Sequence, residues 1–314
     1  MRSEEAKRWY SRKISAFRDV DVLLSISESS RQEAIAYLDF PSGRIVNIST
    51  AASDEFLDLD LAKRKNGEGS ADFLKKHGID RPYLMHSSAF DKRKNFEGLL
   101  EAYALLPQPI REAYQLVLVC KISDKDRSAM HRLMSNLGIP ENDVILPGHV
   151  SDDELISFYV NCKLFVFPSF HEGFGLPILE AMHCGAPVVG SNVSSIPEVI
   201  SNQSALFDPT SPDQMAVFLA DILSDPARLT DLGRHSRVQA GKFNWDKTAR
   251  AALQTLEGAM KEKGCSMNAK PLTLEDVAVA ISHIKRPAQW DQRELAAVAK
   301  ALAKNEETAN RLRR

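Results

Sequence analysis

Short apolar runs alternate with longer amphipathic stretches along most of the chain. The apolar runs are PYLMHSS (82–88), YQLVLVC (114–120), DVILPG (143–148), LFVFPS (164–169) and PVVGS (187–191). Apolar residues recur every three or four positions in the stretches 95–106, 124–138 and 152–162. Continuous apolar runs of this length are typical of strands buried on both faces, and the intervening spacing predicts helices. The alternation therefore predicts an α/β fold, a Rossmann-like parallel sheet with helices on both faces.

The first 56 residues show part of the same pattern. The run VDVLLSI (20–26) predicts a strand buried on both faces, and Ser27 offers an N-cap for a helix over SSRQEAIAYL. A second short strand is predicted at 44–48. Because this β-α-β unit lacks the strands that would precede it, we expect residues 1–56 to be the remnant of a further, N-terminal α/β domain.

A basic segment precedes this unit. Residues 4–18 predict an amphipathic helix, with Trp9, Ile14 and Phe17 as candidate buried positions. Its lysines and arginines allow two interpretations. The helix either packs in the ordinary way with a solvated cationic face, or lies on an anionic membrane surface.

Three further segments complete the expected organisation. The polar segment 57–79 predicts a linker, and the main domain is expected over 80–262. Helices are expected within 212–262, with the last one beginning near Trp245. Residues 263–314 carry no strand signal and predict a helical tail or connector.

Composition narrows the classes of function. The chain has 314 residues, with 40 Lys and Arg against 42 Asp and Glu, and the net charge of −2 gives no electrostatic case for nucleic acid as a partner. No apolar run approaches the roughly 18 residues of a membrane span, and the N-terminus lacks the apolar core of a secretory signal. The four cysteines lie far apart, which argues against a disulfide scaffold or a metal site and favours a cytoplasmic protein.

The segment PSFHEGFGLPILEAMHCGAP (168–187) carries the strongest chemical signal. A strand ends there, a loop with Gly173 and Gly175 follows, and a helix is predicted to begin near Pro177, since proline is favoured at the first helical position. A helix N-terminus at the carboxyl end of a parallel strand is suited to binding phosphate. Glycine in the loop lets the backbone approach such a ligand closely.

Two carboxylates accompany this loop. Glu172 lies in it, and Glu180 lies about one turn into the helix, where it is placed to bind the vicinal hydroxyls of a ribose. The sequence E-G-F-G-L-P-I-L-E-A-M-x-C-G-x-P-V-V resembles the donor-site signature of the retaining family-4 glycosyltransferases, which have the GT-B fold. Glu172 and Glu180 match the first and last Glu of that family's E-x7-E motif. The resemblance extends over roughly 80–262 and includes SSAFDKRKNFEGLLEA, VILPGHVSDDELISFYVNCKLFVFPS, SNVSSIPEVI, ALFDPTSPDQMA and FNWDKTA.

The resemblance implies roles for individual residues. Lys94 and Arg93 would contact the donor diphosphate, with Lys94 the stronger candidate, because a cation offsets the charge that develops on the leaving group. Glu172 would hydrogen-bond the transferred sugar near the reacting carbon, and Glu180 would bind the ribose. The remaining donor-binding residues would be Phe174, Gly175 and Leu176 through their backbone N–H groups, and His149 and Val150 beside the base. The resemblance implies no essential metal, since the family generally works without one, and no other cofactor is expected because the nucleotide sugar is a substrate.

The chain also departs from the family pattern. Ser87 and Ser88 stand where many members have Gly-Arg, so one phosphate contact is expected to be absent. Cys120 and Lys121 stand where Val-Gly is usual, and NISTAASDEF lacks the usual glycine. His171 precedes the motif at a variable position, and we interpret it as structural or solvated rather than catalytic.

The resemblance implies a glycosyltransferase of bacterial polysaccharide or lipopolysaccharide biosynthesis. It would move a sugar from GDP-mannose or a UDP-hexose to a glycan or lipid-linked acceptor with retention, and GDP-mannose is favoured.

In the family the acceptor site lies in a first domain, of which residues 1–56 match only the final helix, strand and helix. We therefore expect either a fragment of a split enzyme or a partner chain that supplies this half. The alternatives are a non-catalytic nucleotide-sugar binding module and a scaffold that uses 263–314 to join another domain; peripheral contact with the inner face of the membrane is also left open.

Overall fold

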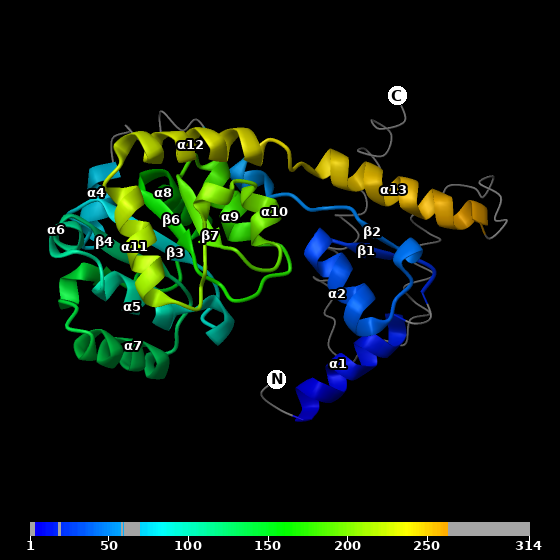
Figure 1. The fold of residues 1–314 in the computed structure, drawn as a ribbon, viewed down its shortest axis with the longest axis horizontal. Helices are drawn as coiled ribbons and strands as arrows, with labels where there is room; N and C mark the ends of the chain where they lie inside the picture. The colour runs from blue at the N-terminus through cyan, green and yellow to red at the C-terminus, as the bar shows by residue number, and fades with distance from the viewer. Residues whose placement is uncertain (1–3, 18–19, 58, 60–69, 263–314) are drawn as a thin grey trace, which may run out of the picture. The chain divides into compact units, whose positions relative to one another are not determined.

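A computed structural model describes residues 4–17, 20–57, 59 and 70–262 (Figure 1). Its main feature is a six-stranded sheet with the strand order β5-β4-β3-β6-β7-β8. The strands are β3 (Tyr83–Ser87), β4 (Gln115–Val119), β5 (Val144–Ile145), β6 (Leu164–Phe167), β7 (Val188–Ser191) and β8 (Leu206–Phe207). All five neighbouring pairs are parallel. The predicted α/β class with a parallel sheet is therefore confirmed.

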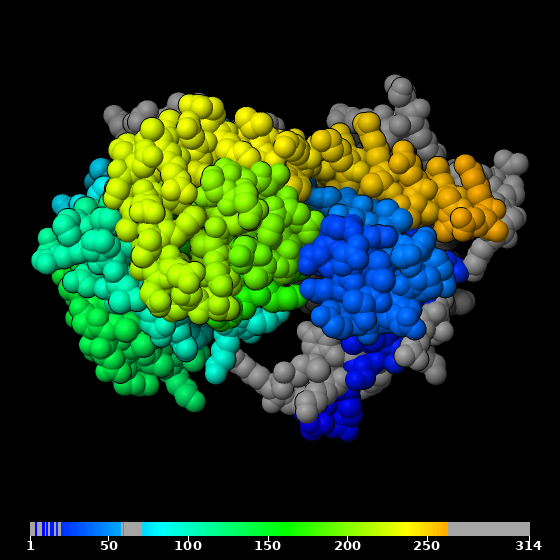
Figure 2. Space-filling model, viewed as in Figure 1, coloured from blue at the N-terminus to red at the C-terminus, as the bar shows by residue number. Residues whose placement is uncertain are grey.

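Helices cover both faces of this sheet. They are α5 (Phe96–Ala104), α6 (Gln108–Ala113), α7 (Asp124–Asn136), α8 (Asp152–Asn161), α9 (Leu176–His183), α10 (Ile196–Ile200), α11 (Pro212–Leu223) and α12 (Pro226–Ala240). Because parallel crossovers are right-handed, the strand order puts α5 and α7 on one face and α8, α9 and α10 on the other. Accordingly α11 packs on α5, and α12 packs on α9 and α10. Figure 2 shows α11 and α12, in yellow, forming much of the surface in that view.

The core of the molecule follows from this layering. The strands β3, β4, β6 and β7 are buried at every position, because helices cover them from both sides. This explains why their sequences are continuous apolar runs rather than alternating ones. Gly190 in β7 allows α10 to pack closely, since a Cβ there would lie 2.8 Å from Ile200 and 2.9 Å from Ile196.

The N-terminal segment forms a separate pair of strands. The helix α1 (Glu4–Phe17) precedes β1 (Leu23–Ser25), α2 (Glu28–Leu38) and β2 (Ile45–Asn47), and β1 pairs with β2 in parallel. Ser27 caps α2 as predicted, accepting a hydrogen bond from the N–H of Ser30. These elements match the predicted order of helix, strand, helix and strand.

Two expectations about burial in this segment are wrong. The strand expected at 20–26 is only three residues long, and Leu24 within it is exposed, because a two-stranded sheet has too little covering structure to bury both faces. In α1 the side chains of Trp9, Ile14 and Phe17 are 53%, 40% and 38% exposed. The helical spacing was identified correctly, but spacing alone does not supply a surface to pack against.

Some elements were not predicted. The helix α4 (Ser70–Lys76) lies inside the segment expected to be a linker, and Lys76 Nζ lies 2.8 Å from Glu154 Oε1 on α8. The short elements α6, α10 and β8 were also missed, since too few residues carry their periodicity. The helix α13 (Trp245–Glu262) begins at the expected residue. The predicted tail at 263–314 and most of the polar part of the linker lie outside the described residues.

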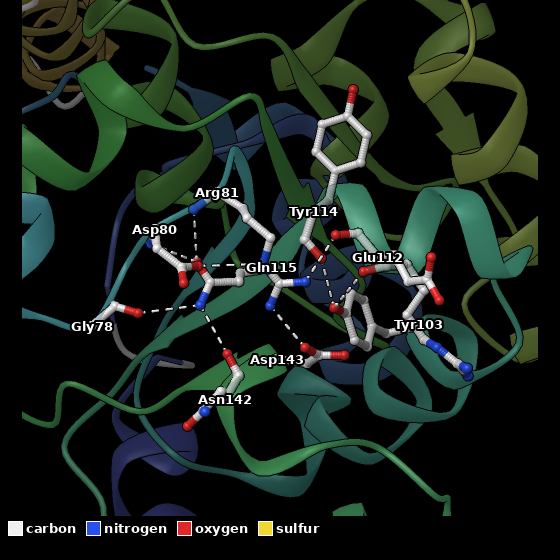
Figure 3. A network of polar contacts seen from close by, with 10 residues as sticks. Gly78, Asp80, Arg81, Tyr103, Glu112, Tyr114, Gln115, Asn142 and Asp143 are labelled. Atoms are coloured by element: carbon white, nitrogen blue, oxygen red, sulfur yellow. Dashed lines mark hydrogen bonds and ion pairs between the residues drawn. The ribbon is translucent and has the colours of Figure 1, made fainter.

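A polar network closes the end of the sheet opposite the carboxyl ends of the strands (Figure 3). Gln115, at the start of β4, is 1% exposed. Its Oε1 accepts hydrogen bonds from the N–H groups of Asp80 at 3.0 Å and Arg81 at 3.2 Å. Its Nε2 donates to the carbonyl oxygens of Gly78 at 3.2 Å and Asn142 at 2.8 Å. One buried side chain thus satisfies four backbone groups from two loops.

We expect Gln115→Leu to lower the free energy of unfolding by about 3–4 kcal/mol, because it removes four hydrogen bonds of roughly 1 kcal/mol each and leaves their backbone partners without a bond. Urea unfolding measures this change. Gln108→Leu is the matched control, since Gln108 is exposed and bonds one side chain, Glu112, at 2.7 Å. Its expected effect is below about 0.5 kcal/mol. Equal losses in the two variants would contradict the structural role given to Gln115.

Candidate functional site

The carboxyl ends of β3 and β6 lie side by side at the centre of the sheet. In chain order, β4 and β5 follow on one side of β3, and β6, β7 and β8 then follow on the other side. Such a reversal of strand order leaves a crevice outside the strand ends, where open α/β sheets bind their ligands. The loop after β3 carries Lys94 and the loop after β6 carries Glu172, so the topology brings two predicted site segments together.

Asn95 fixes the loop that follows β3. Its φ is 57°, in the left-handed region that asparagine tolerates better than most residues, and it caps α5 by accepting a hydrogen bond from the N–H of Gly98 at 3.2 Å. Its Nδ2 donates to the carbonyl oxygens of Pro168 at 3.1 Å and Pro209 at 2.9 Å. This buried side chain therefore joins the loops after β3, β6 and β8, and fixes the backbone beside Lys94.

Lys94 and Glu172 form an ion pair across this junction. Lys94 Nζ lies 2.6 Å from Glu172 Oε1, and the two side chains are only 16% and 11% exposed. The same ammonium lies 5.8 Å from the centre of the Phe167 ring. Because both charges are poorly hydrated, each needs the other, or the charge of a ligand, as compensation.

Serine side chains hold the loop after β6. The N–H of Glu172 donates to Ser194 Oγ at 3.0 Å. Ser195 Oγ lies 3.1 Å from the carbonyl oxygen of Glu172 and 2.9 Å from that of Phe174. The backbone around Glu172 is thus fixed on both sides, which limits the positions that its carboxylate reaches.

The helix α9 begins directly after this loop. Gly175 is its N-cap and has a φ of 102°, a conformation that residues with side chains rarely adopt. The helix starts at Leu176, one residue before the predicted start, so Pro177 occupies the second helical position. The start of α9 therefore lies three to four residues after Glu172 in sequence, at the carboxyl end of β6.

Glu180 is held by a buried tyrosine. Tyr159 Oη donates to Glu180 Oε2 at 3.0 Å, and Ser87 Oγ lies 2.6 Å from the same hydroxyl. Since Tyr159 has one proton and gives it to the carboxylate, Ser87 is the donor in the second bond. Burial raises the pKa of Glu180, the hydrogen bond from Tyr159 opposes this rise, and the charge of Asp152 adds to it.

A cavity of about 280 Å³ opens beside Glu180 at the carboxyl ends of β3 and β4. Its lining includes His149, Val150, Ser88 and Lys121. The structure therefore brings Glu180, His149 and Val150 together, as the resemblance implies, while their binding role stays a prediction. A larger cavity of about 720 Å³ lies between α5 and α7, and none of the predicted site residues lines it.

Other predicted residues are not gathered at the ion pair. Arg93 is 65% exposed, and its Nε lies 3.0 Å from Asp91 Oδ1. Phe174 is buried, with its ring centre 5.6 Å from that of Phe243, whereas Leu176 is exposed. For Phe174 and Leu176, any contact with a ligand is thus left to their backbone N–H groups.

Sequence reasoning missed the contacts that the N-terminal segment makes with the loop after β6. Ser27 Oγ and Ser30 Oγ both donate to the carbonyl oxygen of Gly173, at 2.7 Å and 3.0 Å. His171 Nε2 lies 2.7 Å from Glu33 Oε1, so this histidine contacts α2. The sequence identifies Ser27 only as a helix cap, and nothing in it signals the hydrogen bond from Ser27 to Gly173.

Glu198 makes a further contact of this kind that the sequence does not signal. Its carboxylate accepts hydrogen bonds from the N–H groups of Glu28 at 2.9 Å and Ser29 at 3.0 Å. A carboxylate is favourable at this place, because the N-terminus of a helix carries unpaired N–H groups and a partial positive charge. Glu198 thus adds a side-chain cap to α2 from α10.

Within 4–17, 20–57, 59 and 70–262, no three His, Cys, Asp or Glu side chains are grouped so that they could hold a metal ion. None of the helices in that part of the chain is long and apolar enough to cross a bilayer. The charged groups that the structure places around the crevice include Lys94, Glu172 and Glu180.

The fold and the site define a doubly wound α/β domain with its crevice at the point where the strand order reverses. The family model described as "Glycosyl transferases group 1" matches residues 70–239, more than half of the chain. The chain belongs to this family. The match includes Lys94, Glu172 and Glu180, so the resemblance stated from the motifs is confirmed at the level of the family.

Two relatives from Escherichia coli are mannosyltransferases. The chain is 37% identical over 248 residues to "Serotype-specific mannosyltransferase WbdA", a match that covers 79% of this chain and 30% of the relative. It is 34% identical over 226 residues to "O-antigen chain mannosyltransferase B", covering 72% of this chain and 57% of the relative. The chain thus spans about a third of the first relative and somewhat more than half of the second.

Solved structures of glycosyltransferases share the fold. Sucrose-phosphate synthase from Thermosynechococcus elongatus superimposes with a TM-score of 0.65 at 24% identity, over 85% of this chain and 65% of that one. Anabaena Alr3699/HepE in complex with UDP and glucose gives 0.64 at 19% identity, over 76% and 64% of the two chains. At these identities the likeness shows the fold, and the neighbours have the expected GT-B architecture.

We expect Tyr159→Phe to raise the pKa of Glu180 further, because a largely buried carboxylate loses its donor. Carbon-13 NMR of the glutamate carboxyl groups measures this pKa. Tyr103→Phe is the control, since Tyr103 is equally buried but donates to the carbonyl oxygen of Tyr114 at 2.7 Å. An unchanged pKa in Tyr159→Phe, or the same change in both variants, would show that Tyr159 does not hold Glu180.

Proposed function

We propose that this chain forms the donor-binding half of a retaining mannosyltransferase that uses GDP-mannose in bacterial O-antigen biosynthesis. The observation that carries the proposal is the ion pair of Lys94 and Glu172, which lies where the strand order reverses and next to the start of α9. The similarity to two mannosyltransferases supports the choice of sugar. Membership of the glycosyltransferase family supports the type of reaction.

Each charged group has a distinct part in this proposal. The Lys94 ammonium leaves Glu172 and binds the donor diphosphate, and the start of α9 adds backbone N–H groups and a partial positive charge. Glu172, released from Lys94, accepts hydrogen bonds from hydroxyls of the transferred sugar. Glu180 accepts hydrogen bonds from the ribose. Arg93 reaches the diphosphate only by leaving Asp91, so its contribution is smaller than that of Lys94.

In the proposed reaction the bond between the anomeric carbon and the diphosphate breaks while a bond to the acceptor oxygen forms on the same face. The acceptor hydroxyl gives its proton to the departing diphosphate oxygen. Because the new bond forms on the face that the diphosphate leaves, configuration is retained. Lys94 and the N-terminus of α9 compensate the charge that develops on the diphosphate. In this mechanism protein groups, rather than a resident metal, compensate the negative charge on the diphosphate.

The acceptor half is part of the proposal as well. We propose that a glycan or lipid-linked acceptor binds against a partner domain, supplied by another chain or another segment. A lipid-linked acceptor would place the reaction at the inner face of the membrane, and the exposed Trp9, Ile14 and Phe17 on α1 favour peripheral contact there. The alternative is a module that binds the nucleotide sugar without turnover.

Calorimetric titration of the full chain with GDP and UDP tests the binding site. We expect GDP to bind more tightly, and Lys94→Ala and Glu180→Ala each to weaken it by about 10- to 100-fold, since each removes a hydrogen bond to a charged group. Lys76→Ala is the control, because Lys76 pairs with Glu154 on α8 and lines neither cavity. Unchanged affinity in both site variants would refute the assignment of the site.

A donor assay separates the enzyme from the binding module. GDP-mannose is incubated with the chain alone and with a candidate acceptor domain, and released GDP and mannosylated product are measured. We expect mannose-containing product with an α-linkage that matches the donor. Binding of GDP with neither transfer nor hydrolysis under both conditions would instead support the module, and exclusive use of a UDP-hexose would overturn the proposed sugar.

A further inference from the structure

His86 is a buried histidine that the proposed function does not use. It lies in β3, is 0% exposed and packs against the rings of Phe96, Phe165 and Phe167. Its Nδ1 lies 3.0 Å from the carbonyl oxygen of Val166, and its Nε2 lies 2.9 Å from Ser88 Oγ. Both ring nitrogens thus have polar partners in an otherwise aromatic environment.

The two partners determine where the protons lie. A carbonyl oxygen can only accept, so Nδ1 carries the ring proton. Burial lowers the pKa of His86 to about 3; the bond to Val166 opposes this and the nearby charge of Lys94 adds to it. At neutral pH the ring therefore has a single proton, and Nε2 is a bare acceptor. It follows that the Ser88 hydroxyl donates its proton to His86.

Ser88 is at the same time part of the wall of the cavity beside Glu180. The residues around that cavity include Glu180, His149, Val150 and Lys121. Because the proton of Ser88 is directed inward to His86, the hydroxyl offers lone pairs to the cavity. If Ser88 turned its proton toward a ligand, the buried Nε2 of His86 would lose its hydrogen bond, which is costly in this apolar environment.

The orientation of the Ser88 proton determines which groups of a nucleotide this hydroxyl can bind. Phosphate oxygens at neutral pH only accept hydrogen bonds, whereas ribose hydroxyls and the N–H groups of the base donate them. An oxygen fixed as an acceptor is thus matched to the nucleoside and not to the diphosphate.

We propose that Ser88 is a nucleoside-binding residue, whose Oγ accepts a hydrogen bond from a ribose hydroxyl or from the exocyclic amino group of the base, and that His86 is the positioning residue that fixes it as an acceptor. The inference rests on the proposed function, in that a nucleotide occupies this cavity. Ser88 is then a second hydrogen-bond acceptor, besides Glu180, in the wall of this cavity. The cavity then discriminates ligands by the hydrogen-bond donors of the nucleoside.

The His86 part is tested on the full chain without nucleotide. Nitrogen-15 NMR correlations of the imidazole at pH 7 distinguish the two neutral tautomers and the doubly protonated ring. We expect the tautomer with the proton on Nδ1, unchanged down to pH 5. A proton on Nε2 in the folded wild-type chain, or a charged ring at pH 7, would overturn the proposal whatever the chain binds.

The Ser88 part is tested by combining Ser88→Ala with altered ligands. We expect Ser88→Ala to weaken GDP binding by about five-fold, the effect of one neutral hydrogen bond, and Ser88→Thr to restore most of it. Each of the analogues 2′-deoxy-GDP, 3′-deoxy-GDP and IDP lacks one candidate donor group. We expect wild type and Ser88→Ala to bind with equal affinity the analogue that lacks the group donating to Ser88. That ligand distinguishes a ribose hydroxyl from the exocyclic amino group of the base.

The remaining outcomes separate this proposal from the proposed function. Ser128→Ala is the control for the substitution, since Ser128 is exposed on α7 and donates to the carbonyl oxygen of Asp124 at 2.8 Å. If wild type binds GDP but Ser88→Ala has no effect, or weakens GDP and all three analogues equally, Ser88 is not an acceptor for the nucleoside. If wild type binds neither GDP nor UDP, the proposed function itself fails.

Discussion

The buried carboxamide of Asn95 is the constraint on which the crevice depends. It caps its own helix by accepting a hydrogen bond from Gly98 N–H, and it donates to the carbonyl oxygens of two loops that are distant in sequence. These loops therefore have their positions only when the sheet is complete. Gly98 leaves room for it, since a Cβ at that position would lie 2.4 Å from Asn95 Oδ1. The place of Lys94 is therefore set by a neutral, fully bonded amide, and its charge need not supply the ordering.

The fold was largely predictable because its pattern is strong. The central strands are buried on both faces, and each shows a continuous apolar run between two helices. The errors lie where a local pattern depends on distant partners. Leu24 and Trp9 have the spacing of buried residues, yet the described structure gives them no surface to pack on. Short elements such as β8 and α10 form because neighbouring elements hold them.

The site was predictable in part for a related reason. Glu172 and Glu180 lie in one motif, which the sequence places at the end of a strand and the start of the next helix, and Lys94 follows a neighbouring strand. The supporting residues carry no such signal. Tyr159 comes from α8 and looks like an ordinary core aromatic, and the direction of its proton depends on Glu180 in another helix. His86 is likewise part of an apolar strand, and only its two partners in space reveal its function as an acceptor.

The pairing of Lys94 with Glu172 has a consequence for the rate at which an anion enters. The two charges compensate each other before any ligand arrives, so the empty crevice presents little net field at this point. Long-range acceleration of an encounter requires a net charge opposite to that of the incoming molecule. In the proposed function, a diphosphate therefore gains little speed on its approach from this pair, and the ammonium acts only after contact, when one anionic partner is exchanged for another.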